Sequence, residues 1–222
     1  MTATGTLFVC DGVPVPARLA DDPSLPKKPI NCRGSEANVN LRAENLSEAG
    51  LASVTARAAD LVHRASYIYA ADQEISRGGK TDVYGEEWRR HIVMCIPVTD
   101  QAFWSQGTVR ARLAGLLSFL TDDRWEFEFR TAPREANQLA LGLEKQAIYG
   151  KPDCVILLSG GADSLCAAVE AAGLQRRKPV MVSHRPSTLL DARQTGLVAQ
   201  LKRRFPEWAF PHISFCVHRR GC

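Results

Sequence analysis

The sequence contains no long hydrophobic run. None of its segments approaches the roughly 20 uninterrupted apolar residues that a membrane helix needs. Residues 1–16 also lack the basic start and the apolar core of a secretory signal. We therefore expect no membrane partner and place the protein in the cytoplasm.

Closely spaced cysteines are missing as well. Seven cysteines are spread along the 222 residues, and no pair has the two-residue spacing of zinc knuckles or redox motifs. Four of them lie in apolar runs, where a reduced cysteine behaves as a small buried hydrophobe: Cys95, Cys154, Cys166 and Cys216. The sequence thus supports neither zinc nor a disulfide.

The charge shows little bias. The net charge is +4, and the short basic clusters have no interleaved aromatic residues on which bases could stack, which does not favour a nucleic-acid partner. Hydrophobic residues make up 45% of the chain, enough to fill the core of one large domain or two small ones.

The first half predicts a long helix. A mostly apolar stripe recurs in steps of four and three and ends at Gly78-Gly79: Leu61, Ala65, Ile68, Asp72 and Ile75. We expect this stripe to face a sheet. A carboxylate on such a stripe needs a partner, and a salt bridge from Asp72 to Arg77 or a neighbouring arginine is the simplest expectation.

Two strands and a second helix follow. Residues 91–98 read as a strand, and Trp125, Phe127 and Phe129 alternate with charged residues as another. Between them, one helical face is predicted to be buried, with Thr108 as its cap: Val109, Leu113, Leu116, Leu117 and Leu120. We interpret residues 1–150 as a small α+β domain whose boundary lies near Gly150.

Beyond residue 150, strands alternate with helices. Strands are expected at 154–158, 180–183 and 213–217, and helices at 164–172 and 190–205. This alternation predicts an α/β domain with a parallel sheet in residues 151–222. Sheets usually have about 4 to 6 strands, so this domain is expected to be incomplete.

The run Cys154-Val155-Ile156-Leu157-Leu158 is typical of a central parallel strand that is covered on both faces. It leads into Ser159-Gly160-Gly161-Ala162-Asp163-Ser164, at the edge of the sheet where α/β folds bind ligands. Gly160 and Gly161 permit positive φ angles, so successive N–H groups can converge on an anion.

The start of the following helix strengthens this prediction. Its dipole and unpaired N–H groups favour a phosphate, and the hydroxyls of Ser159 and Ser164 add donors. A lone carboxylate would repel phosphates, so Asp163 is either the N-cap of the helix or a ligand of Mg²⁺ that the phosphates share.

The loop is neither a Walker A loop nor the glycine motif of dinucleotide folds. It resembles the Ser-Gly-Gly-x-Asp-Ser signature of PP-loop ATP pyrophosphatases, in a complete match between strand and helix. The resemblance implies an adenine nucleotide alpha hydrolase-like domain that binds ATP and Mg²⁺ through residues 159–164. It also implies metal binding by Asp163 and catalytic roles for Asp163 and Ser164.

Two looser resemblances cover residues 60–222. Leu165-Cys166-Ala167-Ala168 is similar to the 7-cyano-7-deazaguanine synthases, the QueC proteins. Residues 67–73, 76–79 and 88–90 look like the QueC-like component of Qat anti-phage defence systems, with Asp72, Arg77 and Asp82 in or near them. Together they imply a ligase or synthase acting on a 7-deazaguanine-related carboxylate or amide, with other defence proteins as partners.

PP-loop proteins bind adenine and ribose with groups at the ends of the second and third strands of the sheet. That implies roles here for Ser183, His184 and Arg185, and for His218 and Arg219. QueC enzymes also carry zinc on clustered cysteines, which nothing in this chain matches.

Three hypotheses remain open from the sequence. The first is an enzyme that converts ATP to AMP and pyrophosphate while adenylating its substrate. The second is a truncated, inactive ATP-binding subunit. The third is a transfer-RNA-modifying enzyme of the same superfamily, although the first 150 residues show no RNA-binding signature.

Overall fold

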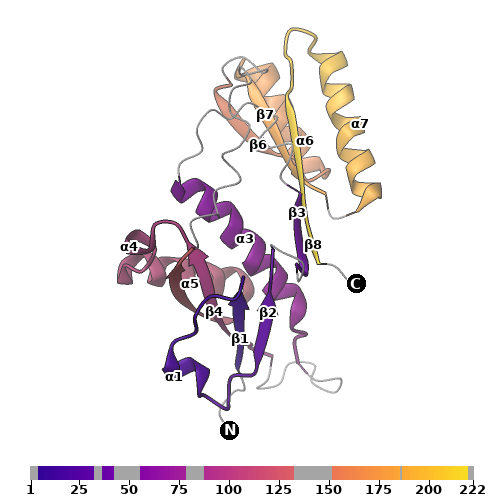
Figure 1. Cartoon of the computed structure of the whole chain (residues 1–222). Coiled ribbons are helices and arrows are strands. Elements are labelled where there is room, and N and C mark those ends of the chain that lie inside the picture. Colours follow the sequence, from indigo (N-terminus) through magenta and orange to yellow (C-terminus); the bar gives the residue numbers. More distant parts are fainter. Residues whose placement is uncertain are drawn as a thin grey trace. The chain divides into compact units, whose positions relative to one another are not determined.

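The chain forms two compact units in a computed structural model (Figure 1). The first unit comprises residues 1–39, 55–136 and 219–222, and the second comprises residues 40–54 and 137–218. The residues described are 5–32, 37–42, 56–78, 88–132, 152–185 and 187–219. The units interleave along the chain, whereas the sequence predicted one boundary near Gly150, a residue outside the described ranges.

The first unit contains a four-stranded sheet in the order β2-β1-β4-β5. Its strands are β1 (Gly5–Cys10), β2 (Lys27–Ile30), β4 (His91–Val98) and β5 (Arg124–Thr131). Its helices are α1 (Ala17–Ala20), α3 (Ala56–Glu74), α4 (Gln101–Trp104) and α5 (Gly107–Thr121). All three strand pairs are parallel, so this unit is α/β and the α+β prediction is wrong.

The two strands predicted in this unit are confirmed. β4 has the expected bounds, and all its residues after His91 are buried. In β5, Trp125, Phe127 and Phe129 are buried and alternate with partly exposed residues. Because strand side chains alternate between faces, these three rings lie on one face, where Trp104 of α4 contacts Phe129.

The predicted buried stripe of α3 is wrong. Leu61 is 54% exposed, and the buried face includes the positions one residue earlier in each turn, at Asp60, Arg64, Tyr67 and Ala71. Polar partners make this possible. Asp60 accepts hydrogen bonds from the backbone N–H of Thr99 and from Trp104 Nε1, and the Arg64 guanidinium stacks on the Trp104 ring.

The predicted burial of α5 is also wrong, since none of its residues is buried. Leu116 is 55% exposed and Leu120 is 65% exposed, although both belong to the expected apolar face. The cap differs too, because Gln106 is the N-cap and Thr108 lies inside the helix. The helix lies alongside β5, the last strand of its sheet.

The second unit contains a four-stranded sheet in the order β3-β8-β7-β6. Its strands are β3 (Val39–Arg42), β6 (Cys154–Leu157), β7 (Pro179–His184) and β8 (His212–Arg219). β6, β7 and β8 pair in parallel, so an α/β unit with a parallel sheet is confirmed here. Its helices are α6 (Ala162–Val169), the π-helical turn η3 (Glu170–Leu174) and α7 (Thr188–Arg204).

Both helices pack on one face of this sheet. The core beneath them contains Leu158, Ala168, Met181, Val198, Leu201 and Phe210. The expectation that β6 is central and covered on both faces is wrong. β6 is the last strand in the order, and on the side away from Ile156 the side chains of Val155 and Leu157 are 66% and 75% exposed.

Membrane-spanning helices were not expected, and among the described residues no helix is both long and apolar enough to cross a bilayer.

Candidate functional site

The predicted loop connects β6 to α6. Gly160 has a φ of +92°, and Gly161 is the N-cap of α6 in an extended conformation without a side-chain cap. Ser159 Oγ donates to Ser164 Oγ at 3.2 Å, and Ser164 Oγ donates to the carbonyl oxygen of Gly161 at 3.0 Å. The N–H of Gly161 donates to Ser159 Oγ at 3.3 Å. The two hydroxyls therefore hold the turn in shape.

Gly160 and Gly161 differ in the space that a Cβ atom would have at each position. A Cβ on Gly160 would meet Leu190 Cδ1 at 3.3 Å and the side chains of Arg193 and Gln194 at 3.5 Å, in a backbone conformation that other residues rarely adopt. Among the described residues, a Cβ on Gly161 would meet only Ser159 Oγ, at 3.6 Å. Gly160 is thus needed for the fold of the loop, whereas Gly161 leaves open space on its exposed side.

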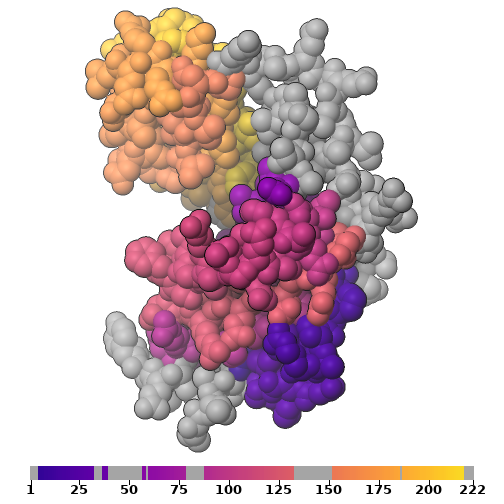
Figure 2. Space-filling model, turned by 90° about the vertical axis from the view of Figure 1, so that its left-hand side faces the viewer, coloured from indigo at the N-terminus to yellow at the C-terminus, as the bar shows by residue number. Residues whose placement is uncertain are grey.

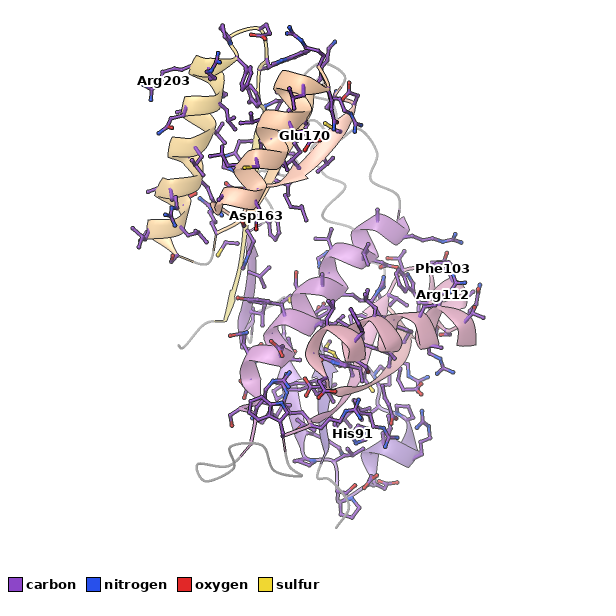
Figure 3. All side chains as sticks on the ribbon, turned by 180° about the vertical axis from the view of Figure 1, so that it is seen from behind. His91, Phe103, Arg112, Asp163, Glu170 and Arg203 are labelled. Carbon is purple, nitrogen blue, oxygen red and sulfur yellow. The ribbon has the colours of Figure 1, made fainter. Side chains whose placement is uncertain are left out.

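Asp163 is the second residue of α6 and is exposed, as is Ala162 (Figure 3). The N-cap interpretation of Asp163 is wrong, because the helix begins one residue earlier and Gly161 caps it. The carboxylate instead stands at the positive end of the helix dipole, beside the first N–H groups of the helix, which have no partner within it.

No group of three metal-ligating side chains occurs in the part of the chain that the structure describes. Mg²⁺ is commonly held by one or two carboxylates together with substrate phosphates. The single exposed carboxylate of Asp163 fits that kind of shared site, and it does not fit a site built from protein ligands alone.

The end of β7 lies beside the loop, because β6 and β7 pair in parallel and finish at the same edge. Ser183, expected to bind nucleotide, is buried, and its Oγ donates to the carbonyl oxygen of Leu158 at 2.8 Å. His212 Nε2 lies 2.9 Å from the same Oγ. The proton of Ser183 is already used, so Nε2 is the donor in this pair. Burial lowers the pKa of His212 below its ordinary value.

His184 and Arg185 follow at the same edge and are half-buried. The ring of His184 packs against Phe215, with centroids 5.4 Å apart, and its Nε2 accepts a hydrogen bond from the N–H of Val217 at 3.4 Å. Arg185 Nη1 lies 3.4 Å from Asp191 on α7. Both side chains therefore tie β7 to its neighbours, and the charge of Arg185 lies at the edge that carries the loop.

Gln194 is a site residue that the sequence did not indicate. It lies on α7 and is 0% exposed. Its Nε2 donates to the carbonyl oxygens of Ser159 at 3.3 Å and of His184 at 3.0 Å. One side chain thus fixes the ends of both strands. The one signal for it in the sequence is a polar residue at a position where the helical period of α7 predicts an apolar one.

The remaining predicted residues have no described contact with this loop. The side chains of His218 and Arg219, and all of Asp82, lie outside the described residues. Asp72 pairs with Arg90 instead of Arg77, which confirms a neighbouring arginine as its partner. Arg77 pairs with Asp123 at 2.7 Å, so this cluster belongs to the first unit and stabilises it.

No family model, curated protein or solved structure matches this chain.

Proposed function

We propose that the chain binds ATP with Mg²⁺ at residues 159–164. The observation that carries the proposal is the turn at Gly160, which has a φ of +92° between the end of a parallel strand and the start of α6. A phosphate at this point meets helix N–H groups and the positive end of the dipole, and the open side of Gly161 lets it approach the backbone.

Each loop residue has a role in this proposal. The hydroxyls of Ser159 and Ser164 turn from each other and from the Gly161 carbonyl to donate to phosphate oxygens. Asp163 holds Mg²⁺, which neutralises phosphate charge when bound. His184 and Arg185 provide the adjoining wall for the nucleoside, while buried Ser183 contributes through its backbone.

The reaction we propose is adenylation, as the resemblance to PP-loop and QueC proteins implies. A carboxylate or amide oxygen of the substrate attacks the α phosphorus, the bond to the bridging oxygen of the β phosphate breaks, and pyrophosphate leaves. An amine then displaces AMP from the adenylate. The chain contributes mainly by positioning the two reactants and by stabilising phosphate charge. A 7-deazaguanine-related substrate and a role in anti-phage defence follow from the same resemblance.

The first test measures thermal unfolding with and without Mg²⁺ and ATP, because a ligand of the folded state must raise its stability. Asp163→Asn should lose the Mg²⁺-dependent part of the shift. Glu170→Gln, in the same helical segment but at the far end from the loop (Figure 3), should keep it. An equal shift in wild type and Asp163→Asn would contradict the assignment of Asp163.

Product analysis tests the reaction itself. Active protein should release AMP and pyrophosphate in equal amounts, and ADP as the product would refute adenylation. Adenylation that depends on added transfer RNA would instead favour the RNA-modifying enzyme.

A second candidate is an ATP-binding subunit without turnover. It is favoured by the exposed apolar side chains of β6, since parallel sheets are normally covered on both faces. ATP-dependent stabilisation without AMP release would support it. Restoration of AMP release by a partner protein would show that the site is completed in an assembly.

A further inference from the structure

Helix α5 presents an apolar ridge to solvent. Phe119 is 85% exposed, Leu120 65% and Leu116 55%, and no residue of the helix is buried. Large side chains of this kind are common singly on protein surfaces, but a contiguous exposed cluster usually marks an interaction site. The ridge lies on the unit that contains the β2-β1-β4-β5 sheet and is independent of the ATP site proposed above.

Beside the ridge runs an apolar groove of about 340 Å³ between α3 and α5. The α3 side supplies Leu61, which is 54% exposed, and Tyr69, which is 37% exposed. The groove lining includes Leu61, Ile68, Trp104, Leu113, Leu116 and Leu117. Leu116 therefore belongs to both features, so the ridge and the groove form one surface. Figure 2 views the molecule from the side on which α4 lies.

We propose that this surface binds a second copy of the chain, with the two α5 helices antiparallel across a twofold axis near Leu117. In such a pair, residues whose numbers are equally far from 117 face each other. Phe119 of one copy then lies over Gly115 of the other, and each ridge enters the groove of its partner. A twofold interface requires this self-complementarity, because the same patch is used twice.

A glycine in the middle of α5, Gly115, supports this arrangement. Glycine there costs about 1 kcal/mol relative to alanine, and a Cβ at this position would meet nothing within 4 Å among the residues that the structure describes. The described residues of one copy give no reason for the glycine. A Phe119 ring from a second copy does, because it needs a shallow hollow opposite it.

Charge is complementary in the same register. Arg112 is exposed on α5 and projects from the unit in Figure 3. Asp122 caps the other end of the helix and is exposed beside Arg89, at 3.4 Å. The antiparallel register puts Arg112 of one copy opposite Asp122 of the other, twice. A parallel arrangement would put like charges together.

The area is close to what a dimer needs. With full areas on the order of 200 Å² per large side chain, Leu61, Tyr69, Leu116, Phe119 and Leu120 expose roughly 600 Å² of surface, and their partly exposed neighbours add to it. A stable interface of standard size buries about 800 Å² per partner.

Sedimentation equilibrium of the full chain at about 1–100 µM tests the proposal, with far-ultraviolet circular dichroism and thermal unfolding as checks on the fold. Wild type should dimerise. Phe119→Ser should weaken the dimer roughly thirtyfold, as loss of a central aromatic residue does. Leu189→Ser removes an equally exposed leucine, 82% exposed, from the second unit and should leave association unchanged.

Gly115→Leu separates folding from association. It should stabilise the helix of each copy, since leucine forms helix better than glycine, yet weaken the dimer at least tenfold by filling the hollow for Phe119. A wild type that stays monomeric at 100 µM would overturn the proposal and leave the surface to a different partner. So would a dimer that both Phe119→Ser and Gly115→Leu leave intact.

Discussion

The side-chain amide of Gln194 donates a hydrogen bond to the carbonyl oxygen of Ser159, the first residue of the candidate phosphate loop. The same nitrogen reaches His184 at the end of the neighbouring strand. The position of the loop relative to β7 thus depends on a helix residue 35 positions further along the chain. The loop and the end of β7 are therefore held in fixed positions before any ligand that contacts both of them binds.

We predict that Gln194→Leu destabilises the second unit by about 1–3 kcal/mol, because it removes the side-chain donor of two part-buried hydrogen bonds, to the carbonyl oxygens of Ser159 and His184. The volume of the side chain is nearly kept, so the loss should come from the hydrogen bonds. Denaturant unfolding measures it. Gln200→Leu, at an exposed position of the same helix, is the matched control and should change stability little. Equal effects of the two substitutions would contradict the role given to Gln194.

The two glycines of the loop allow a paired prediction. Gly160→Ala should cost about 1–3 kcal/mol, since a methyl group is strained at its positive φ and would also press on Leu190 at 3.3 Å. Gly161→Ala has φ of −91° and space for a Cβ, so the fold should tolerate it.

The response to ATP gives a second way to compare the two glycine substitutions. If a phosphate approaches the exposed side of Gly161, Gly161→Ala should weaken ATP-dependent stabilisation while the protein remains as stable as wild type without ligand. Thermal unfolding with and without ATP and Mg²⁺ measures both quantities for each variant. A Gly161→Ala protein that responds to ATP as wild type does would argue against close approach at this glycine.

The sequence predicted strands and loop better than it predicted burial. The bounds of β4 and the alternation in β5 follow from local patterns of residues. The buried face of α3 does not, because Asp60 and Arg64 are buried through partners 40 residues away, around Trp104. A pattern based on hydrophobicity assigns such residues to solvent.

The candidate site shows the same limit. The residues of the loop are contiguous, so a motif could find them. Gln194 and His212 come to the site only through the packing of α7 and β8 against β7, and neither lies in a recognisable pattern. The covering of β6 was also mispredicted, because an apolar run indicates a buried strand without indicating which side of it has a neighbour.

His212 should make the second unit sensitive to mild acid. Burial lowers its pKa below the unfolded value of about 6.5, so the unfolded chain binds the proton more readily. Stability is therefore fully present above pH 6.5 and falls as the pH drops through the lowered pKa. His212→Gln should flatten this dependence below about pH 6.5. Urea unfolding at several pH values measures it, and parallel curves for the two proteins would exclude His212 as the source.

The first unit offers a test of how buried charge is held. Arg90 donates to the fully buried carboxylate of Asp123 and to the carbonyl oxygens of Asp72 and Ile75. Burial alone would raise the pKa of Asp123, but hydrogen bonds from Arg90 and the charges of Arg90 and Arg77 outweigh it and lower the pKa.

Arg90→Lys keeps the charge but loses the planar set of donors that reaches all these oxygens at once. We expect a loss of about 3 kcal/mol or more, since a broken buried pair leaves Asp123 poorly compensated. Arg89→Lys next to it changes an exposed arginine and should cost less than about 0.5 kcal/mol. Denaturant unfolding measures the loss of stability in both variants. If Arg90→Lys costs as little as Arg89→Lys, the positive charge alone stabilises Asp123 and the geometry of the guanidinium is not needed.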